Sequence, residues 1–312
     1  MANPQFDFYD KTTLKSYNLD ATMRYQLTML DNLDPFTRVH SENVASIVCR
    51  LCEYLHCRKN FISYCTICAY LHDIGKMFIP LKILNKPERL TDSEYEIMKT
   101  HTLIGYKMCM DDLKLRPYAL GPKYHHEALD GSGYPDGLKG NQIPYEDQII
   151  KVADEYDAIV SKRQYKTHIH ISETLKLLIK DAQPNPKTAA LDNAAQGVRI
   201  GRLNKKVVRA LFKVVIQDTE YEISCVIGYL DFLKEQIKRL ETIDRYHQKM
   251  MQATSEHKIS YYKEGMRMLF SDGETFENYQ NVLEEYKQAL VTRKIMVDQL
   301  YDEIKIIKKL RV

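Results

Sequence analysis

Histidine and aspartate residues gather in short motifs along this chain of 312 residues, which holds ten histidines. His72-Asp73 follows an apolar stretch and is followed by Ile-Gly-Lys76, while His125-His126 precedes a segment rich in turn formers. Imidazole nitrogens and carboxylate oxygens together suit iron, manganese or zinc. A charged group at the end of a buried helix costs free energy unless a partner such as a metal ion satisfies it. We therefore interpret the two motifs as parts of a metal centre.

Three more residues of these types lie in separate segments: His40 in DPFTRVHSENVA, His101 in MKTHTLIG and Asp154 in IIKVADEYDA. All three fall on expected helices or at helix ends. A single histidine on a helix is more often a core or surface residue than a ligand, so the order of the whole set carries the information. We expect His168 and His170 to lie on a solvated face.

The elements that position these residues are predicted to be helices. Apolar residues recur at helical spacing in three segments, 41–56, 61–73 and 149–161. Thr91-Asp-Ser-Glu94 has the form of a capping box and opens a helix that reaches His101 and continues beyond it. Gly121-Pro122 predicts a break before a short helix at 124–128. The segment 130–137 is dense in Gly, Pro, Asp and Ser, which indicates a loop.

Later in the chain, residues 205–221 are also predicted to be helical, and the pattern changes from about residue 226. Apolar residues there keep a seven-residue rhythm in two stretches, with a break predicted at 271–274. Asp244, His247 and Arg293 interrupt the two seams. Two interpretations stay open: a helical hairpin that packs within the chain, and a coiled coil that forms a homodimer.

Composition excludes several classes of function. Subtracting 42 acidic from 45 basic residues leaves a net charge of +3, which favours neither DNA binding nor a polybasic membrane anchor. No apolar run approaches the ~18 residues of a membrane-spanning helix. Seven cysteines without a secretory signal indicate a reducing cytoplasm rather than a disulfide framework. The pairs Cys49/Cys52 and Cys65/Cys68 lie in apolar stretches and are expected in the core.

The order of the histidine and aspartate motifs resembles the HD-GYP domain, a branch of the HD metal-dependent phosphohydrolases. The resemblance runs from about residue 30 to residue 221 and includes the loop that names the family, Gly133-Tyr134-Pro135. It implies an all-α protein built as an HD-type helical bundle. It also implies a phosphodiesterase that acts on cyclic di-GMP, with linear pGpG and, in some members, GMP as the product.

The resemblance further implies two divalent metal ions bridged by Asp73. One ion is expected on His40, His72, Asp73 and Asp154, and the other on Asp73, His101, His125 and His126. Family members with three metals carry a glutamate four residues before the first histidine, where this chain has Phe36, which cannot ligate a metal. We therefore expect two ions, with iron or manganese as the native metal, because both suit nitrogen and oxygen ligands.

Hydrolysis of a phosphodiester needs a nucleophile and neutralisation of charge at the phosphate. Two cations about 3.5–4 Å apart can supply both through a bridging hydroxide. We assign catalytic roles to Asp73, which would fix the spacing, and to Lys76, which would add positive charge at the phosphate. By resemblance, Arg163 and Lys166 in SKRQYK contact the phosphates of the substrate, although Gln164 stands where the family has proline.

Two acidic residues and the family loop each have more than one interpretation. Glu127 and Asp130 could orient the imidazoles from behind, or only stabilise the loop. Tyr134 and Pro135 could shape the loop, or form a substrate lid or a partner-docking surface. The sequence alone does not separate these roles.

The expected organisation is an N-terminal extension at 1–22, an HD-GYP catalytic domain at 23–225 and a C-terminal helical region at 226–312. The leading hypothesis is a cytoplasmic phosphodiesterase for cyclic di-GMP. One alternative keeps the fold and changes the substrate to another cyclic dinucleotide or a nucleotide monoester. The other is a signalling module that binds the nucleotide, or a diguanylate-cyclase-type protein, without turnover.

Overall fold

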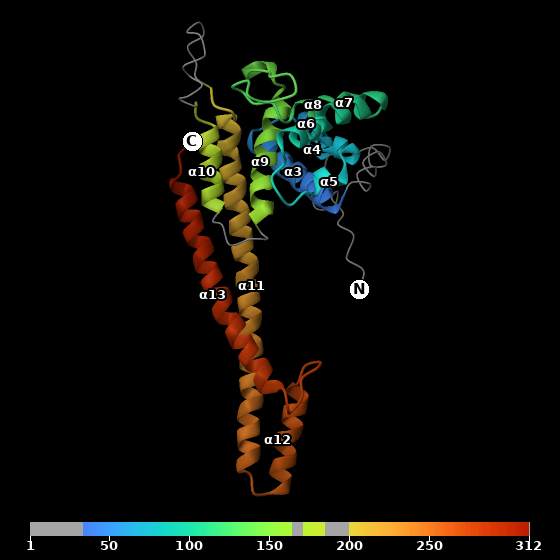
Figure 1. Cartoon of the computed structure of the whole chain (residues 1–312). Helices are drawn as coiled ribbons and strands as arrows, with labels where there is room; N and C mark the ends of the chain where they lie inside the picture. The colour runs from blue at the N-terminus through green and yellow to red at the C-terminus, as the bar shows by residue number, and fades with distance from the viewer. Residues whose placement is uncertain (1–33, 164–170, 185–199, 312) are drawn as a thin grey trace. The chain divides into compact units, whose positions relative to one another are not determined.

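The structure is a computed structural model that describes residues 34–163, 171–184 and 200–311. Within these ranges the regular structure is helical, apart from one isolated bridge between Asp130 and Lys139. This confirms the prediction of an all-α protein, and Figure 1 shows its helices in chain order. In the same ranges no helix is both long enough and apolar enough to cross a membrane.

The chain divides into two compact units. The first extends to Val215 and takes in the end of the chain from Lys309, and the second runs from Ile216 to Lys308. The division predicted near residue 225 falls inside the long helix α11 (Lys205–Gln252). The extension predicted at 1–22 lies outside the described residues.

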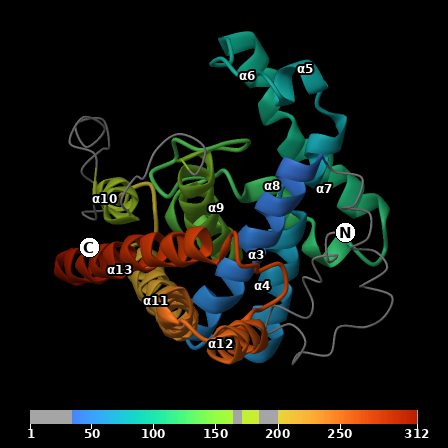
Figure 2. The same ribbon diagram turned by 90° about the horizontal axis from the view of Figure 1, so that it is seen from below.

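The first unit is a bundle of helices joined by short turns. Before α11 it contains α3 (Pro35–Tyr54), α4 (Lys59–Leu71), η3 (Ile74–Phe78), α5 (Leu81–Leu84), α6 (Asp92–Lys99), α7 (His101–Asp111), η4 (Arg116–Tyr118), α8 (Leu120–Tyr124), η5 (Gly140–Gln142), α9 (Tyr145–Arg163) and α10 (Ile171–Asp181). Helix α3 packs on α4 and α9, and α8 packs on α4, α7 and α9, a grouping that Figure 2 shows from below. The candidate ligands therefore come from helices that touch one another.

Helix α3 begins earlier than the predicted segment 41–56, because its start is marked by polar residues rather than by apolar ones. The side chain of Asp34 accepts a hydrogen bond from the amide of Thr37 at 3.0 Å, and proline occupies the first helical position. Val44, Val48 and Leu51 are fully buried along the face that packs into the bundle. His40 lies on this helix, one turn before the apolar face begins.

A backbone contact joins the end of α4 to the start of α7. Helix α4 ends at Leu71, with His72 as its C-cap, and Asp73 leads into the short helix η3. A Cβ atom on Gly75 would lie 2.0 Å from the carbonyl oxygen of His101, so only glycine allows the two backbones to approach this closely. The chain thereby brings Asp73 next to His101.

Two predicted elements around the site differ in detail from the structure. The capping box of Thr91 and Glu94 is confirmed, but α6 ends at Lys99 and a separate helix, α7, starts at His101. The helix predicted at 124–128 is wrong, since α8 spans Leu120–Tyr124 and contains Pro122. Proline is tolerated in a first turn because the amides there have no intrahelical partner, so it did not mark a break.

The four cysteines of the two Cys-x-x-Cys pairs are buried, and all seven cysteines of the chain are free thiols. Both pairs lie on the packed helices α3 and α4. This agrees with the expectation that they are core residues.

The second unit contains the later part of α11, α12 (Glu256–Leu269) and α13 (Tyr279–Lys309). Leu230 and Ile223 of α11 form one buried cluster with Val297 and Ile304 of α13. A second cluster joins all three helices and is centred on the buried side chains Leu240, Ile243, Met266, Tyr279 and Leu283. The two heptad stretches thus pack against each other within the chain, as the hairpin interpretation expects.

Residues that interrupt the seams of the second unit have partners. The hydroxyl of the buried Tyr279 lies 2.9 Å from both a carboxylate oxygen of Asp244 and Nδ1 of His247. Arg239 donates two hydrogen bonds of 2.6 Å to the carboxylate of Glu274. These polar groups are therefore satisfied by one another, without any need for a ligand.

Candidate metal centre

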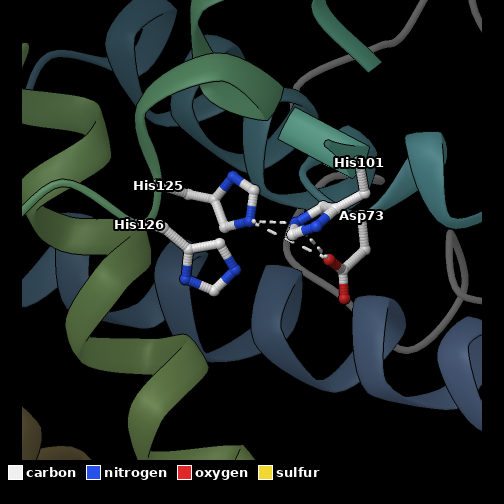
Figure 3. A group of neighbouring side chains, drawn as sticks. All are labelled: Asp73, His101, His125 and His126. Atoms are coloured by element: carbon white, nitrogen blue, oxygen red, sulfur yellow. Dashed lines mark hydrogen bonds and ion pairs between the residues drawn. The ribbon is translucent and has the colours of Figure 1, made fainter. Parts of the chain in front are cut away.

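The structure brings the seven predicted metal ligands together from five parts of the first unit. They are His40 on α3, His72 and Asp73 at the junction of α4 and η3, His101 at the start of α7, His125 and His126 at the end of α8, and Asp154 on α9. Figure 3 shows four of them, with His101 and His125 facing the carboxylate of Asp73. These four form one possible metal-binding group, and His40, His72 and Asp73 form a second.

Asp73 lies between the two groups, and its two oxygens face different histidines. Oδ1 lies 3.4 Å from Nε2 of His101 and 3.8 Å from Nε2 of His125. Oδ2 lies 3.2 Å from Nε2 of His72 and 3.8 Å from Nε2 of His40. A carboxylate in this position can bridge two cations.

Asp154 approaches the same cluster from α9. Its Oδ1 lies 3.0 Å from Nε2 of His40 and 4.0 Å from Nε2 of His72. Its Oδ2 lies 4.0 Å from Nδ1 of His126. Asp154 thus lies near histidines of both groups. The resemblance implies that it ligates only one of the two metals.

Backbone carbonyls orient three of the imidazoles. Nδ1 donates a hydrogen bond to the carbonyl three residues earlier in His72 (2.6 Å, to Ala69), His101 (2.7 Å, to Met98) and His125 (2.9 Å, to Pro122). This contact fixes the tautomer and leaves the lone pair of Nε2 directed into the cluster. The recurring geometry explains why all three histidines lie at the first or last turn of a helix.

The other two imidazoles are held differently. Nδ1 of His40 lies 2.7 Å from a carboxylate oxygen of Asp157, one turn after Asp154 on α9. The ring of His126 stacks on Tyr134, with ring centroids 4.7 Å apart and an interplanar angle of 25°. His126 is therefore positioned by a neighbouring ring rather than by a hydrogen bond to the backbone.

Several nitrogen and oxygen atoms of the cluster lack hydrogen-bond partners in the part of the chain that the structure describes, and could instead ligate a divalent cation. Nε2 of His72 and Oδ1 of Asp73 are buried and make no hydrogen bond to the described residues. The Nε2 atoms of His101 and His125 lie 3.2 Å apart while their Nδ1 atoms bond carbonyls, which places two lone pairs face to face. Buried polar atoms without partners cost free energy, and a cation between them removes that cost.

Charge states in the cluster suit metal binding. Burial lowers the pKa of His125 and His126 well below the ordinary histidine value, so both are neutral. Burial alone would raise the pKa of Asp73, but its interactions with His72 and Lys76 outweigh burial and hold that pKa well below its usual range. Neutral imidazoles and ionised carboxylates are the forms that ligate metals.

His40 differs from the other histidines. Burial opposes its protonation, but hydrogen bonds to Asp154 and Asp157 outweigh burial and raise its pKa to about 10. Without a cation, a proton on this imidazole neutralises the carboxylates, so metal binding would have to displace that proton.

Lys76 lies at the rim of the cluster. Its Nζ donates to Oδ2 of Asp73 at 2.5 Å, and its side chain is partly exposed. Burial would lower the pKa of Lys76, but the charge of Asp73 outweighs it and raises that pKa, so the group is an ammonium. Lys76 also lines a cavity beside the cluster, as a residue that contacts a substrate phosphate would.

Glu127 and Asp130 stabilise the loop that follows α8, which is one of the two roles considered for them. The buried carboxylate of Glu127 accepts hydrogen bonds from the amides of residues 136, 137 and 138 at 2.7–3.0 Å. Asp130 accepts from the amide and hydroxyl of Ser132. A Cβ on Gly133 would lie 2.3 Å from the amide nitrogen of Ala128, so the loop needs glycine there.

Some predicted site residues are not described by the structure, and some residues of the site were not predicted from the sequence. The side chain of Arg163 and residues 164, 166, 168 and 170 lie outside the described residues. Sequence reasoning missed Asp157, although its spacing from Asp154 places both on one helix face. It also missed Lys151, Glu155 and Arg202 in the cavity wall, and for Arg202 no local signal was available.

Comparisons with known proteins agree with the motifs. A family model described as "HD domain" matches residues 24–185, about half of the chain. The chain is 41% identical over 146 residues to "Cyclic di-GMP phosphodiesterase" of Thermotoga maritima, covering 46% of this chain and 39% of that protein. It is 39% identical over 135 residues to "Cyclic di-GMP phosphodiesterase response regulator RpfG" of Xanthomonas campestris, covering 43% and 36%.

A third relative carries a different substrate in its name. "3'3'-cGAMP-specific phosphodiesterase 1" of Vibrio cholerae is 31% identical over 153 residues, covering 48% of this chain and 35% of that protein. The chain thus matches less than two-fifths of the length of each of these three relatives.

Proposed function

The chain belongs to the HD domain family and carries the motifs of its HD-GYP branch, and on that premise we propose that it is a metal-dependent phosphodiesterase that hydrolyses cyclic di-GMP to pGpG, GMP or both. The observation that carries the proposal is the convergence of five histidines on the carboxylate of Asp73, with Asp154 beside three of them; the histidines are His40, His72, His101, His125 and His126. Two curated relatives named for this activity support the choice of substrate.

Divalent cations bound here would neutralise charge on the phosphate and lower the pKa of water so that hydroxide is available near neutral pH. Asp73 holds the two sets of histidines at a fixed spacing through its two oxygens. Lys76 would exchange part of its contact with Asp73 for a phosphate oxygen and so stabilise the developing negative charge. The stacked rings of Tyr134 and His126 form part of the cavity wall.

We propose two ions per chain, with iron or manganese as the native metal. The donor set of imidazole and carboxylate supports these metals, because thiolates are absent from the described cluster. Phe36 at the position of the third-metal glutamate supports two rather than three.

The test is a measurement of metal and turnover on the same sample. The protein is purified without oxygen, its metal content is measured by mass spectrometry, and it is incubated with cyclic di-GMP while products are separated by chromatography. We expect about two ions per chain and conversion to linear product. Asp73→Asn should lose both the metal and the turnover, while His257→Asn, which changes an exposed histidine of the second unit, should lose neither.

Two results would contradict the proposal. Full metal content with no turnover of any cyclic dinucleotide would favour the alternative of a signalling module that binds without hydrolysis. A stoichiometry near three would overturn the inference drawn from Phe36.

A second candidate substrate is 3'3'-cGAMP, which the name of one Vibrio cholerae relative supports. The same assay with cyclic di-GMP, 3'3'-cGAMP and cyclic di-AMP ranks the substrates by kcat/KM. A preference for 3'3'-cGAMP would keep the reaction and replace the substrate.

Location and partners are also part of the proposal. Seven free thiols support a reducing compartment such as the cytoplasm. A homodimer through residues 226–312 and a diguanylate-cyclase-type partner remain hypotheses, and the heptad residues already pack within the chain. Sedimentation of the full chain tests the dimer.

A further inference from the structure

A cavity of about 360 Å³ lies beside the ligand cluster and contains groups that metal binding does not use. Lys76, His101 and His126 belong both to the cluster and to the cavity wall. The wall also contains three charged residues outside the cluster, Lys151, Glu155 and Arg202. The volume is within the range of small-molecule sites, about 300–1,000 Å³.

Lys151 is a buried cation next to the cluster. It precedes Asp154 by three residues on α9, and its side chain is only 7% exposed. Its Nζ lies 3.4 Å from the carbonyl oxygen of His126 and 3.3 Å from Oε1 of Glu155. A buried ammonium needs such partners, because its transfer from water is costly.

Arg202 is held in place by its backbone and leaves its guanidinium available. Its amide donates to the carbonyl of Asp181 at 2.7 Å, and its carbonyl accepts from the amide of Leu129 at 3.0 Å. The guanidinium lies 3.5 Å from Asp181 and 3.9 Å from Glu155, and it donates no hydrogen bond to the part of the chain that the structure describes. The planar fork carries five N–H donors, and none of them donates a hydrogen bond to either carboxylate.

At this end of the cavity, the wall itself contains more cations than carboxylates. Lys151 and Arg202 share the carboxylate of Glu155, and Arg202 is also near Asp181, which lies outside the cavity wall. Within the wall, two cations face one carboxylate. A planar guanidinium beside an ammonium binds a phosphate well, because the fork can donate two parallel hydrogen bonds to its oxygens.

We propose that Lys151 and Arg202 form a subsite for the phosphate of a cyclic dinucleotide that is not being cleaved. Such a substrate has two phosphodiesters, and the metal centre can act on only one at a time. Glu155 spaces the two cations and moderates their charge. The inference rests on the proposed function, since it names how that site recognises its substrate.

The test compares a substrate with two phosphodiesters to one with a single phosphodiester. Cyclic di-GMP and bis(p-nitrophenyl) phosphate are assayed with the wild-type protein, Arg202→Gln and Lys205→Gln, which changes an exposed lysine near the start of α11. A charged hydrogen bond contributes about 10–100-fold in binding. In Arg202→Gln, we expect kcat/KM for cyclic di-GMP to fall at least about tenfold more than kcat/KM for bis(p-nitrophenyl) phosphate, mainly through KM.

Glu155→Gln distinguishes a phosphate subsite from a site at which Glu155 binds a nucleobase. Removing a carboxylate that repels a phosphate should lower KM for cyclic di-GMP. If Glu155 instead accepted hydrogen bonds from a nucleobase, the same change would raise KM and overturn the proposal. The two variants thus have effects of opposite sign if the subsite binds phosphate.

Calorimetric binding of cyclic di-GMP to the chelator-treated protein keeps the test independent of turnover. Suppose that the wild-type protein hydrolyses no cyclic dinucleotide, but that Arg202→Gln weakens binding of cyclic di-GMP about tenfold. This pair of results would remove the proposed function and support the subsite. Equal losses for both substrates in Arg202→Gln would remove the subsite and leave the proposed function intact. Thermal melting of each variant shows whether the fold is kept.

Discussion

Two groups of buried polar side chains, one in each unit, differ in whether their polar atoms have partners. In the first unit, Nε2 of His72 and Oδ1 of Asp73 are buried without a hydrogen bond to any described residue. In the second unit, the buried hydroxyl of Tyr279 is bonded to Asp244 and His247, and Glu274 is bonded to Arg239. Unsatisfied groups cost stability and satisfied groups preserve it. Buried polar atoms without partners are therefore typical of a ligand-binding site. Buried polar atoms that bond one another are typical of a region that only stabilises the fold.

The largest expected effect comes from removing a ligand that is unsatisfied without metal. His72→Leu should abolish metal uptake and lower kcat by more than the roughly 10–100-fold that changes behind the ligands cost. The metal-free variant should unfold at nearly the same urea concentration as the metal-free wild type, because the loss of the unpartnered Nε2 offsets the loss of the hydrogen bond from Nδ1 to Ala69. Metal analysis and urea unfolding after chelation measure the two effects.

A clear loss of stability in the chelated His72→Leu protein would remove the contrast between the units. It would mean that His72 stabilises the fold by itself.

The reverse behaviour is expected in the second unit. Leu240 is fully buried in the cluster that joins α11, α12 and α13. Leu240→Ala should destabilise that unit by about 2–5 kcal/mol while metal content per folded chain stays unchanged. Calorimetry and metal analysis of the same sample check this, and Met251→Ala, at an exposed position on α11, is the matched control. Loss of metal from folded Leu240→Ala protein would contradict the separation of roles.

A smaller effect is expected for the carboxylate behind His40. Asp157→Asn keeps the shape of the side chain but removes the charge that faces Nδ1 of His40 at 2.7 Å. Metal affinity should fall about 10–100-fold, measured by competition with a chelator. Asp302→Asn, an exposed change in the second unit, should leave the affinity as it is. Unchanged affinity in Asp157→Asn would show that the carboxylate does not position the ligand.

The smallest expected effect is a pH dependence of stability in the second unit. Hydrogen bonds from Arg239 lower the pKa of Glu274 below its usual range, which is about 4.3 in an unfolded chain. A depressed pKa stabilises the fold above the unfolded value, and the contribution disappears as the pH falls through the folded pKa. The stability difference between wild type and Glu274→Gln should therefore be present at pH 7 and shrink below about pH 4.3. Urea unfolding across this range measures it, and a difference that grows on acidification would be inconsistent with the pair.

The sequence was informative where chemistry and local structure coincide. His72 and Asp73 were predicted as ligands because a polar pair follows an apolar helix, and the capping box at Thr91 was readable from four consecutive residues. Helix α8 was predicted wrongly because Pro122 can end a helix or lie in its first turn, and the choice depends on what the helix packs against.

Residues that act through the fold were harder to predict. From the sequence, Glu127 could orient an imidazole or stabilise a loop. The structure shows the second role, because the amides of residues 136, 137 and 138 donate to its carboxylate. Arg202 reaches the cavity because its backbone pairs with residues 129 and 181, which are distant in sequence. Periodicity and spacing carry no information about such pairings.

The contact at Gly75 has a consequence for how the centre could accept different ions. Only backbone separates η3 from α7 at that point, so no side-chain rotamer is available there to change the spacing between Asp73 and His101. His126, in contrast, is held by a ring stack with Tyr134 and not by a backbone contact of this kind. The centre thus has a rigid side and a compliant side, and differences in ionic radius would be absorbed at His126.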